Sequence, residues 1–385
     1  MDKAMLCIKN AQIYDAVNPI SYKGDLLIQN GKIVSIAAEI PTEPGMEVYD
    51  AAGYRVYPGF VDAHSHIGLD GYGIGYEGSD YNEINDICSP QLRAIDGIQP
   101  WDPMLQEAAR AGVTTIATGP GSANVLGGTF AAIKTPKKVR VEQMIIRPEV
   151  AMKCAFGENP KRCYQKTSDS TRMSTAAILR ETLFRARDYM ERLEAAGDDV
   201  TKRPPFNMKY QALIPVLKRE IPLKAHAHQA NDFFTALRIA KEFHVRITLE
   251  HVTEGHLAAD ELAREHVPLA VGPSFGHATK FELRNKTWTT PAVLSQAGCQ
   301  VSIITDAPVT PEHYLPLCAG LAVKAGMDPF EALKAITIHP ARHIGVEDRV
   351  GSLEVGKDAD LVITDGSPFD VFTNVKDVFV DGVKL

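Results

Sequence analysis

The sequence lacks several features that would place it in a specialised class of protein. Its six cysteines include no CxxC pair, it has no long basic run, and no uninterrupted apolar stretch approaches about 18 residues. These absences argue against a zinc finger, a disulfide framework, a nucleic-acid-binding surface and a membrane-spanning helix. The start of the chain also lacks the basic and apolar pattern of a secretory signal. We therefore expect a cytoplasmic protein with reduced thiols that binds neither nucleic acid nor a membrane.

What the chain does contain is enough apolar material for a large folded core. Hydrophobic residues make up 45% of its 385 residues, charged residues make up 23%, and the formal net charge is -7. This balance is typical of a globular protein and excludes a disordered or collagen-like chain. The length fits an α/β barrel of about 250 residues with an accessory domain.

Both ends of the chain alternate apolar and polar residues, as β-strands with one buried face do. In the N-terminal part, turn signals such as Asn30-Gly31 break this pattern into short runs. Neither end alone has enough strands for an independent core. We therefore predict one composite β-domain, a small β-sandwich, formed by residues 1–56 and 346–385.

Residues 57–345 instead alternate short apolar runs with amphipathic stretches, which is the pattern of βα units around a parallel sheet. We predict a (β/α)8 TIM barrel for this part of the chain. The predicted strands are Phe60–Ile67, Thr114–Thr118, Phe130–Ile133, Val150–Phe156, Leu223–His228, Arg246–Val252, Leu269–Val271 and Val301–Thr305. The predicted helices are Ser174–Ala196, Asp232–Phe243, Leu257–His266, Pro291–Ala297 and Tyr314–Ala325.

Histidines and an aspartate stand at the ends of four of these predicted strands. His64 and His66 form an HxH pair, and alternate residues of a strand face the same way, so both imidazoles should project together. His226, His251 and Asp306 end the fifth, sixth and eighth strands. Carboxyl ends of barrel strands meet at one face, and imidazole and carboxylate suit zinc best, with iron, manganese and nickel as alternatives. The sequence therefore predicts a site for one or two divalent metal ions at this face.

These residues, together with the tail DRVGSLEVGKDADLVITDG, resemble the amidohydrolase superfamily over almost the whole chain. Within it the sequence is most similar to the imidazolonepropionase-related group, which includes Xaa-Pro dipeptidases. The resemblance implies hydrolysis of an amide or cyclic-amide C–N bond by a metal-activated hydroxide, with Asp306 as general base and then general acid. It makes His64, His66 and Asp306 ligands of one metal. His226 and His251 would bind a second metal or contact the substrate.

For a two-metal site the resemblance also implies a bridging carboxylate from the fourth strand. Lys153 lies in the apolar run and would become a bridge by carbamylation, since a buried amine with a depressed pKa can react with carbon dioxide. Glu158, which follows Gly157, is the alternative bridging ligand. An ion-paired or snorkelling lysine and a loop-stabilising glutamate are the structural alternatives.

Three more residues are candidates for binding a small-molecule substrate. His228 shares a strand face with His226, Asn124 lies in a glycine-rich loop, and Arg147 could pair with a carboxylate. Supporting another ligand, making a turn and forming a structural salt bridge are the respective alternatives. We expect the long segment 68–100 to cover the site or to form a contact in a homo-oligomer.

Two other functions stay open from the sequence. A mononuclear deaminase would hold one metal with the HxH pair, His226 and Asp306, and would leave Lys153 unmodified. Deaminases of the superfamily usually carry a glutamate three residues after the histidine of strand five, where this chain has Gln229. A non-catalytic scaffold is the second alternative, although such chains tend to lose metal ligands. The sequence does not identify the substrate.

Overall fold

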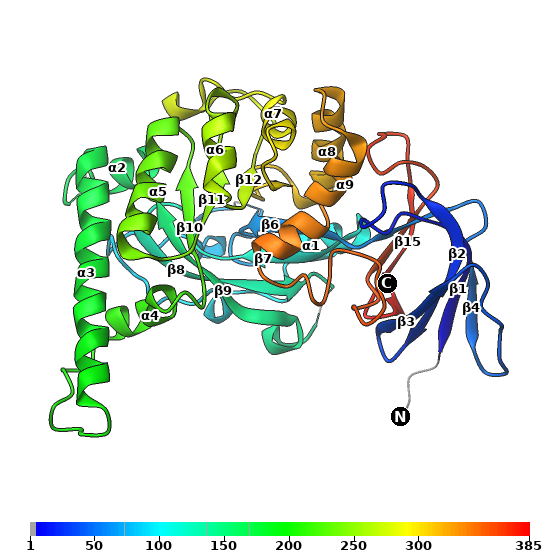
Figure 1. Ribbon diagram of the computed structural model, residues 1–385, viewed down its shortest axis with the longest axis horizontal. Coiled ribbons are helices and arrows are strands. Elements are labelled where there is room, and N and C mark those ends of the chain that lie inside the picture. Colours follow the sequence, from blue (N-terminus) through cyan, green and yellow to red (C-terminus); the bar gives the residue numbers. More distant parts are fainter. Residues whose placement is uncertain (1–4, 73, 137, 169) are drawn as a thin grey trace.

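The computed structural model describes residues 5–72, 74–136, 138–168 and 170–385. Figure 1 shows two regions, with strands of both chain ends gathered on one side and a larger sheet covered by helices on the other. All six cysteines are free of disulfides. Among the described residues, no helix is long and apolar enough to cross a membrane.

Strands from both chain ends form one sheet, in the order β16-β15-β14-β5-β1-β2-β3, with β4 also paired to β1. These strands are β1 (Leu6–Ile13), β2 (Tyr22–Gln29), β3 (Lys32–Ala37), β4 (Glu47–Asp50), β5 (Arg55–Pro58), β14 (Leu361–Thr364), β15 (Val375–Val380) and β16 (Val383–Lys384). The two ends join where β14 runs antiparallel to β5, with Leu361 opposite Pro58. A two-layered β-sandwich and the domain boundaries at 56/57 and 345/346 stay predictions.

The turn between β2 and β3 follows from its two residues. Asn30 and Gly31 have φ angles of 52° and 79°. A two-residue hairpin turn of the type that suits twisted strands requires positive φ at both positions, which asparagine and glycine tolerate best. Gln29 and Lys32 accordingly face each other across the hairpin.

The second sheet contains all eight strands predicted for the barrel and forms a nearly closed barrel. Its strands are β6 (Phe60–Ser65), β7 (Val113–Thr118), β8 (Leu126–Lys134), β9 (Ile145–Ala155), β10 (Leu223–Ala227), β11 (Ile247–His251), β12 (Leu269–Val271) and β13 (Val301–Ile303), in sequential order. The two outer strands meet through the segments that follow them: the amide of His66 donates to the carbonyl of Ala307 at 2.8 Å.

One part of this barrel corrects the predicted (β/α)8 architecture. Strand β8 runs antiparallel to both β7 and β9, whereas the other neighbouring pairs are parallel. The described residues of the links 119–125 and 135–144 contain no α-helix, only the 3-10 turn Val141–Gln143. A parallel crossover needs a connection of about a dozen residues or more, so these short links favour antiparallel pairing.

Helices pack around the barrel mainly in its second half. They are α1 (Pro103–Arg110), α2 (Glu158–Tyr164), α3 (Arg172–Ala196), α4 (Met208–Leu217), α5 (Ala230–Phe243), α6 (Ala259–Glu265), α7 (Thr290–Gln296), α8 (Leu315–Lys324), α9 (Pro329–Ala335) and α10 (Ile338–His343). In Figure 1, α5 to α8 lie along one side of the sheet, and α3 stands at the end remote from the strands of the chain ends. The five predicted helices correspond to α3 and α5–α8. Leu257 and Tyr314 are exceptions, because each ends a 3-10 turn that precedes the helix.

The parallel strands decide where polar side chains gather. Because β6, β10, β11, β12 and β13 run in the same direction, their carboxyl ends lie at one face of the barrel. Strand β9 also ends there, since it is parallel to β10. The histidines, the lysine and the aspartate predicted as metal ligands all lie at or just after these ends.

Candidate metal centre

The HxH pair ends strand β6 with both imidazoles buried. His66 Nδ1 lies 2.7 Å from the carbonyl oxygen of Gly119. A carbonyl only accepts, so Nδ1 carries the hydrogen and Nε2 of the neutral ring has a lone pair. That Nε2 lies 3.2 Å from Asp306 Oδ1. Two acceptors facing each other at this distance favour a cation between them, as a metal site requires.

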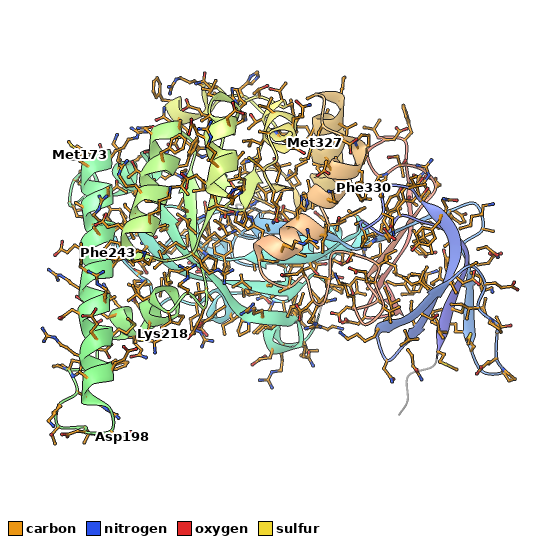
Figure 2. The ribbon with its side chains drawn as sticks, in the orientation of Figure 1. Met173, Asp198, Lys218, Phe243, Met327 and Phe330 are labelled. Atoms are coloured by element: carbon orange, nitrogen blue, oxygen red, sulfur yellow. The ribbon has the colours of Figure 1, made fainter. Side chains whose placement is uncertain are left out.

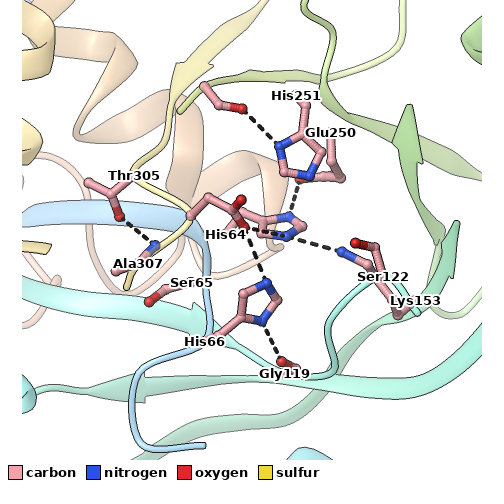
Figure 3. A network of polar contacts seen from close by, with 12 residues as sticks. His64, Ser65, His66, Gly119, Ser122, Lys153, Glu250, His251, Thr305 and Ala307 are labelled. Atoms are coloured by element: carbon pink, nitrogen blue, oxygen red, sulfur yellow. Dashed lines mark hydrogen bonds and ion pairs between the residues drawn. The ribbon is translucent and has the colours of Figure 1, made fainter. Parts of the chain in front are cut away.

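His64 lies between three polar groups, of which Glu250 and Lys153 are labelled in Figure 3. Its Nδ1 is 2.9 Å from Glu250 Oε2, and its Nε2 is 3.1 Å from Lys153 Nζ and 3.6 Å from Asp306 Oδ1. Burial and the charge of Lys153 hold the pKa of His64 well below its usual value. The neutral ring donates to the Glu250 carboxylate through Nδ1, so Nε2 offers a lone pair to a metal.

Glu250 is a carboxylate that sequence reasoning missed. It also accepts hydrogen bonds from Lys224 Nζ at 2.8 Å and Thr248 Oγ1 at 2.7 Å, and lies 2.8 Å from His343 Nε2. Burial alone would raise the pKa of Glu250, but Lys224 and His343 hold it well below its usual value. The sequence did contain a signal for this carboxylate. Lys224 and Glu250 carry opposite charges, and each interrupts one of two apolar strands that are neighbours in the barrel.

A second group of imidazoles lies beside the first. One ligand nitrogen from each of His226, His228 and His251 can be chosen so that all three atoms lie within 4.8 Å of one another. His251 Nδ1 is 2.8 Å from the carbonyl of Gly272, which leaves Nε2 with a lone pair. Burial lowers the pKa of His226 and His228 well below the usual value, and that of His251 to about 4. All three rings are therefore neutral and can act as ligands at neutral pH.

Unpartnered nitrogens show that this second group fits a metal ion. Both ring nitrogens of His226 and Nε2 of His251 are buried without a hydrogen-bond partner. A buried polar atom without a partner costs about 1–3 kcal/mol. A divalent cation would satisfy Nε2 of His251 and the one nitrogen of His226 that has a lone pair, and His251 also forms a triad with His64 and Asp306. His228, predicted to bind substrate, thus lies among candidate ligands.

Glu282 is a second carboxylate near the imidazoles that sequence reasoning missed. Its Oε1 lies 3.9 Å from His226 Nε2, 3.7 Å from His228 Nε2 and 2.6 Å from Lys280 Nζ. Gly157 gives it room: at φ +81° a Cβ on this residue would lie 2.5 Å from Glu282 Oε2. Glu282 belongs to a 3-10 turn in the loop after β12. Such a loop has no regular spacing of apolar residues that could have singled it out in the sequence.

Lys153 approaches the imidazoles more closely than the alternative bridge does. It is fully buried with no carboxylate oxygen within 4.0 Å in the part of the chain that the structure describes. Burial lowers its pKa to about 8. Glu158 begins α2, where its amide donates to Glu282 Oε2 at 2.9 Å, and no hydrogen bond or ion pair of its side chain occurs among the described residues. Lys153 thus contacts His64, whereas the Glu158 side chain makes no hydrogen bond or ion pair with any of the described imidazoles.

Two residues predicted to bind substrate have other surroundings. Asn124 is buried, and its Nδ2 lies within hydrogen-bond reach of the carbonyls of Glu83 and Asp86 and the hydroxyl of Tyr164, so it holds the segment 68–100 in place. Arg147 lies six residues before Lys153 in the same strand, about 20 Å away at about 3.3 Å per residue. It is exposed and donates to Gly345 at 3.0 Å. The assignment of Arg147 to the substrate site is therefore corrected.

Part of the segment 68–100 lies against the site on the side of His66. The ring centroid of Tyr81 lies 5.2 Å from that of His66, and the Tyr81 side chain is half-buried. The backbone of the segment is tied to its own start, because the amide of Asp80 donates to Leu69 at 2.7 Å. This supports the predicted covering role. A homo-oligomer contact stays a prediction.

Backbone strain also gathers at this face. His251, Val252 and Asp306 have φ angles of 74°, 43° and 55°, in the left-handed region that non-glycine residues rarely adopt. Such conformations cost on the order of 1–3 kcal/mol each and cluster at functional sites. In this protein they turn the chain sharply at the end of β11 and just after β13, where His251 and Asp306 belong to the same triad.

Comparison with known proteins assigns the chain to a family. The model of the amidohydrolase family matches residues 55–385. The chain belongs to the amidohydrolase family. A solved amidohydrolase structure from Thermotoga maritima MSB8 is 40% identical to it, with a TM-score of 0.95 and 99% of each chain covered.

Two curated relatives place this amidohydrolase among hydrolases of carbon–nitrogen bonds. The imidazolonepropionase of Symbiobacterium thermophilum is 27% identical, over 88% of this chain and 83% of the relative. The amidohydrolase tasK of Hapsidospora irregularis is 29% identical over 93% of this chain, which spans only 39% of that protein. The protein is thus an enzyme of this class, whose members generally use divalent metals, and its clustered histidines can hold one.

Proposed function

We propose that this amidohydrolase binds two divalent metal ions and hydrolyses an amide or cyclic-amide bond. Zinc is the metal that we propose for both sites. The observation that carries the proposal is the pair of triads that share one residue. His64, His251 and Asp306 form the first, and His226, His228 and His251 form the second. Their neutral, buried imidazoles and one carboxylate are the ligands that zinc prefers.

The residues divide naturally between two metals. His64, His66 and Asp306 would hold one ion, because Asp306 Oδ1 faces the Nε2 atoms of both histidines at 3.6 and 3.2 Å. His226 and His251 would hold the other, with His228 as an added ligand. When bound, such ions polarise a substrate carbonyl and lower the pKa of water from about 15.7 towards 7.

Asp306 would move the proton. Burial raises its pKa, but His251 and His66, when they carry a proton, outweigh burial and hold it below the usual value. The side chain is 16% exposed, so a water molecule can reach it. An ionised Asp306 accepts a proton from the attacking water and then donates it to the leaving nitrogen, which is general base and general acid catalysis in turn.

Lys153 would supply the bridge between the two sites after carbamylation. Its neutral Nζ attacks the carbon of carbon dioxide, a new N–C bond forms as one C=O π bond opens onto oxygen, and the amine passes one proton to water. The product is a carbamate with two acceptor oxygens. The absence of a carboxylate partner within 4.0 Å among the described residues supports this role, since a buried lysine without one is costly as a cation. Glu158 remains the alternative bridge.

A mononuclear deaminase is less well supported. Gln229 occupies the position at which deaminases of the superfamily carry a glutamate, and its Oε1 accepts a hydrogen bond from Arg172. An amide cannot take up and release a proton at neutral pH as a carboxylate does. This chain thus lacks the expected proton carrier at that position.

The test combines metal analysis with a substrate screen. Protein expressed with excess zinc or manganese and bicarbonate should contain two metal ions per chain. It should hydrolyse at least one compound among cyclic amides, N-acyl amino acids and Xaa-Pro dipeptides. Protein without stoichiometric metal under these conditions would overturn the proposal. The cytoplasmic location and the homo-oligomer stay predictions.

A further inference from the structure

A cavity of about 560 Å³ opens at the amino ends of β10, β11 and β12, at the opposite end of these strands from the imidazoles. The last turns of α5, α6 and α10 complete its walls. Phe243, labelled in Figure 2, ends α5 next to it. Its charged wall includes Arg219, Lys241, Arg246, Glu265, Arg342 and His343. The volume lies within the range of small-molecule sites, about 300–1,000 Å³.

The charge of this wall is positive although the whole chain carries a net charge of -7. Lys241 is neutralised by Glu265, whose Oε2 lies 2.6 Å from Lys241 Nζ. Arg219, Arg246 and Arg342 have no carboxylate oxygen within 4.0 Å in the described ranges of the chain. Arg219 donates to the carbonyl of His244 at 3.1 Å, and Arg342 acts electrostatically on Glu354. Three exposed arginines without a carboxylate in direct contact therefore line one cavity and favour an anion there.

A buried histidine joins the inner wall of the cavity to the barrel interior. The side chain of His343 is 1% exposed, and its Nε2 lies 2.8 Å from the Glu250 carboxylate. His343 is also one of the residues that line the cavity. The imidazole therefore closes the inner end of the cavity, and the exposed arginines are the groups that a ligand can reach.

We propose that this cavity binds a phosphate-bearing small molecule. A phosphate group offers three acceptor oxygens and nearly two negative charges, which three guanidinium forks can share. A single carboxylate offers only two oxygens and one charge. The site is separate from the proposed metal centre, and its existence does not depend on the proposed function.

The experiment measures binding of fructose 1,6-bisphosphate to the metal-loaded protein by titration calorimetry. We expect saturable binding of one molecule per chain, with no comparable binding of fructose. Arg246→Gln combined with Arg342→Gln should weaken binding at least tenfold. Arg238→Gln is the matched control, because Arg238 lies on α5, does not line the cavity and hydrogen-bonds only to Thr235 among the described residues.

Three results would overturn the proposal. They are no saturable binding at millimolar bisphosphate, equal affinity for fructose, and unchanged affinity in the double variant. The last result would show that the arginines serve only to stabilise the carboxyl ends of neighbouring helices, or that the probe binds elsewhere. Metal content and hydrolytic activity are measured separately, so failure here leaves the proposed function untouched.

Discussion

Glu250 Oε2 lies 2.9 Å from Nδ1 of His64, inside the barrel and out of contact with solvent. This contact fixes the direction in which the imidazole presents Nε2 to the metal centre. The same carboxylate neutralises Lys224, so one buried group both orients a ligand and satisfies a buried cation. Its removal should therefore affect metal binding and stability together.

Glu250→Gln should weaken metal binding about 10- to 100-fold, the usual effect of losing a partner of a ligating histidine. It should also lower the melting temperature, because Lys224 would remain buried without an opposite charge. Chelator competition and thermal unfolding measure the two effects. Glu261→Gln is the control, since Glu261 is exposed and pairs only with Arg264 in the described structure. Unchanged metal affinity in Glu250→Gln would contradict the positioning role.

Asp306→Asn should reduce kcat/KM by about 10²- to 10⁴-fold or more, since a general acid or base usually contributes that much. It should also weaken metal binding. Steady-state kinetics on the substrate found by the screen gives the ratio, and circular dichroism checks the fold. His64→Ala should cause a loss of several orders of magnitude. Near-normal turnover in either folded variant would refute the assignment.

Lys153→Met should abolish stimulation of activity by bicarbonate, because methionine fills the buried site without an amine. Intact mass measured under non-denaturing conditions should show one added carbon dioxide in the wild-type chain and none in this variant. Glu158→Gln should keep both the added mass and the stimulation. The opposite pattern, with Glu158→Gln inactive and Lys153→Met active, would make Glu158 the bridge.

His228→Asn tests whether this residue is a ligand or a substrate contact. If it helps to hold the second metal, metal content should fall from two ions towards one per chain at limiting metal. His256→Asn is the control, since His256 makes its hydrogen bond to Thr290, 2.9 Å away. A change in KM with full metal content would assign His228 to the substrate instead.

Lys134→Met should destabilise the contact between the two sheets. Lys134 Nζ, at the end of β8, lies 2.5 Å from Asp360 Oδ2 and 3.1 Å from Asp358 Oδ2, and both carboxylates are buried. Without the Lys134 cation, the two buried carboxylates have less positive charge near them. Breaking a buried ion pair in this way lowers the free energy of unfolding by about 3–5 kcal/mol. Denaturant unfolding measures the loss. The exposed Lys138→Met should have almost no effect.

Much of the site followed from local sequence. The two-residue period of a strand places His64 and His66 on one face whatever the rest of the chain does. Apolar runs likewise marked the eight barrel strands, and their ends located His226, His251 and Asp306. The direction of β8 was predicted wrongly because an apolar run carries no information about its orientation.

Only the tertiary structure decided which buried charges meet. Glu250 reaches His64 because strands β6 and β11 lie in one barrel, and Glu282 reaches His228 because an irregular loop folds back over the site. Arg147 lies far from the imidazoles although Lys153 shares its strand. The sequence by itself determined the types of ligand and their strand ends. The pairing between strands determined their neighbours, because hydrogen-bond register and loop closure join residues that are distant along the chain.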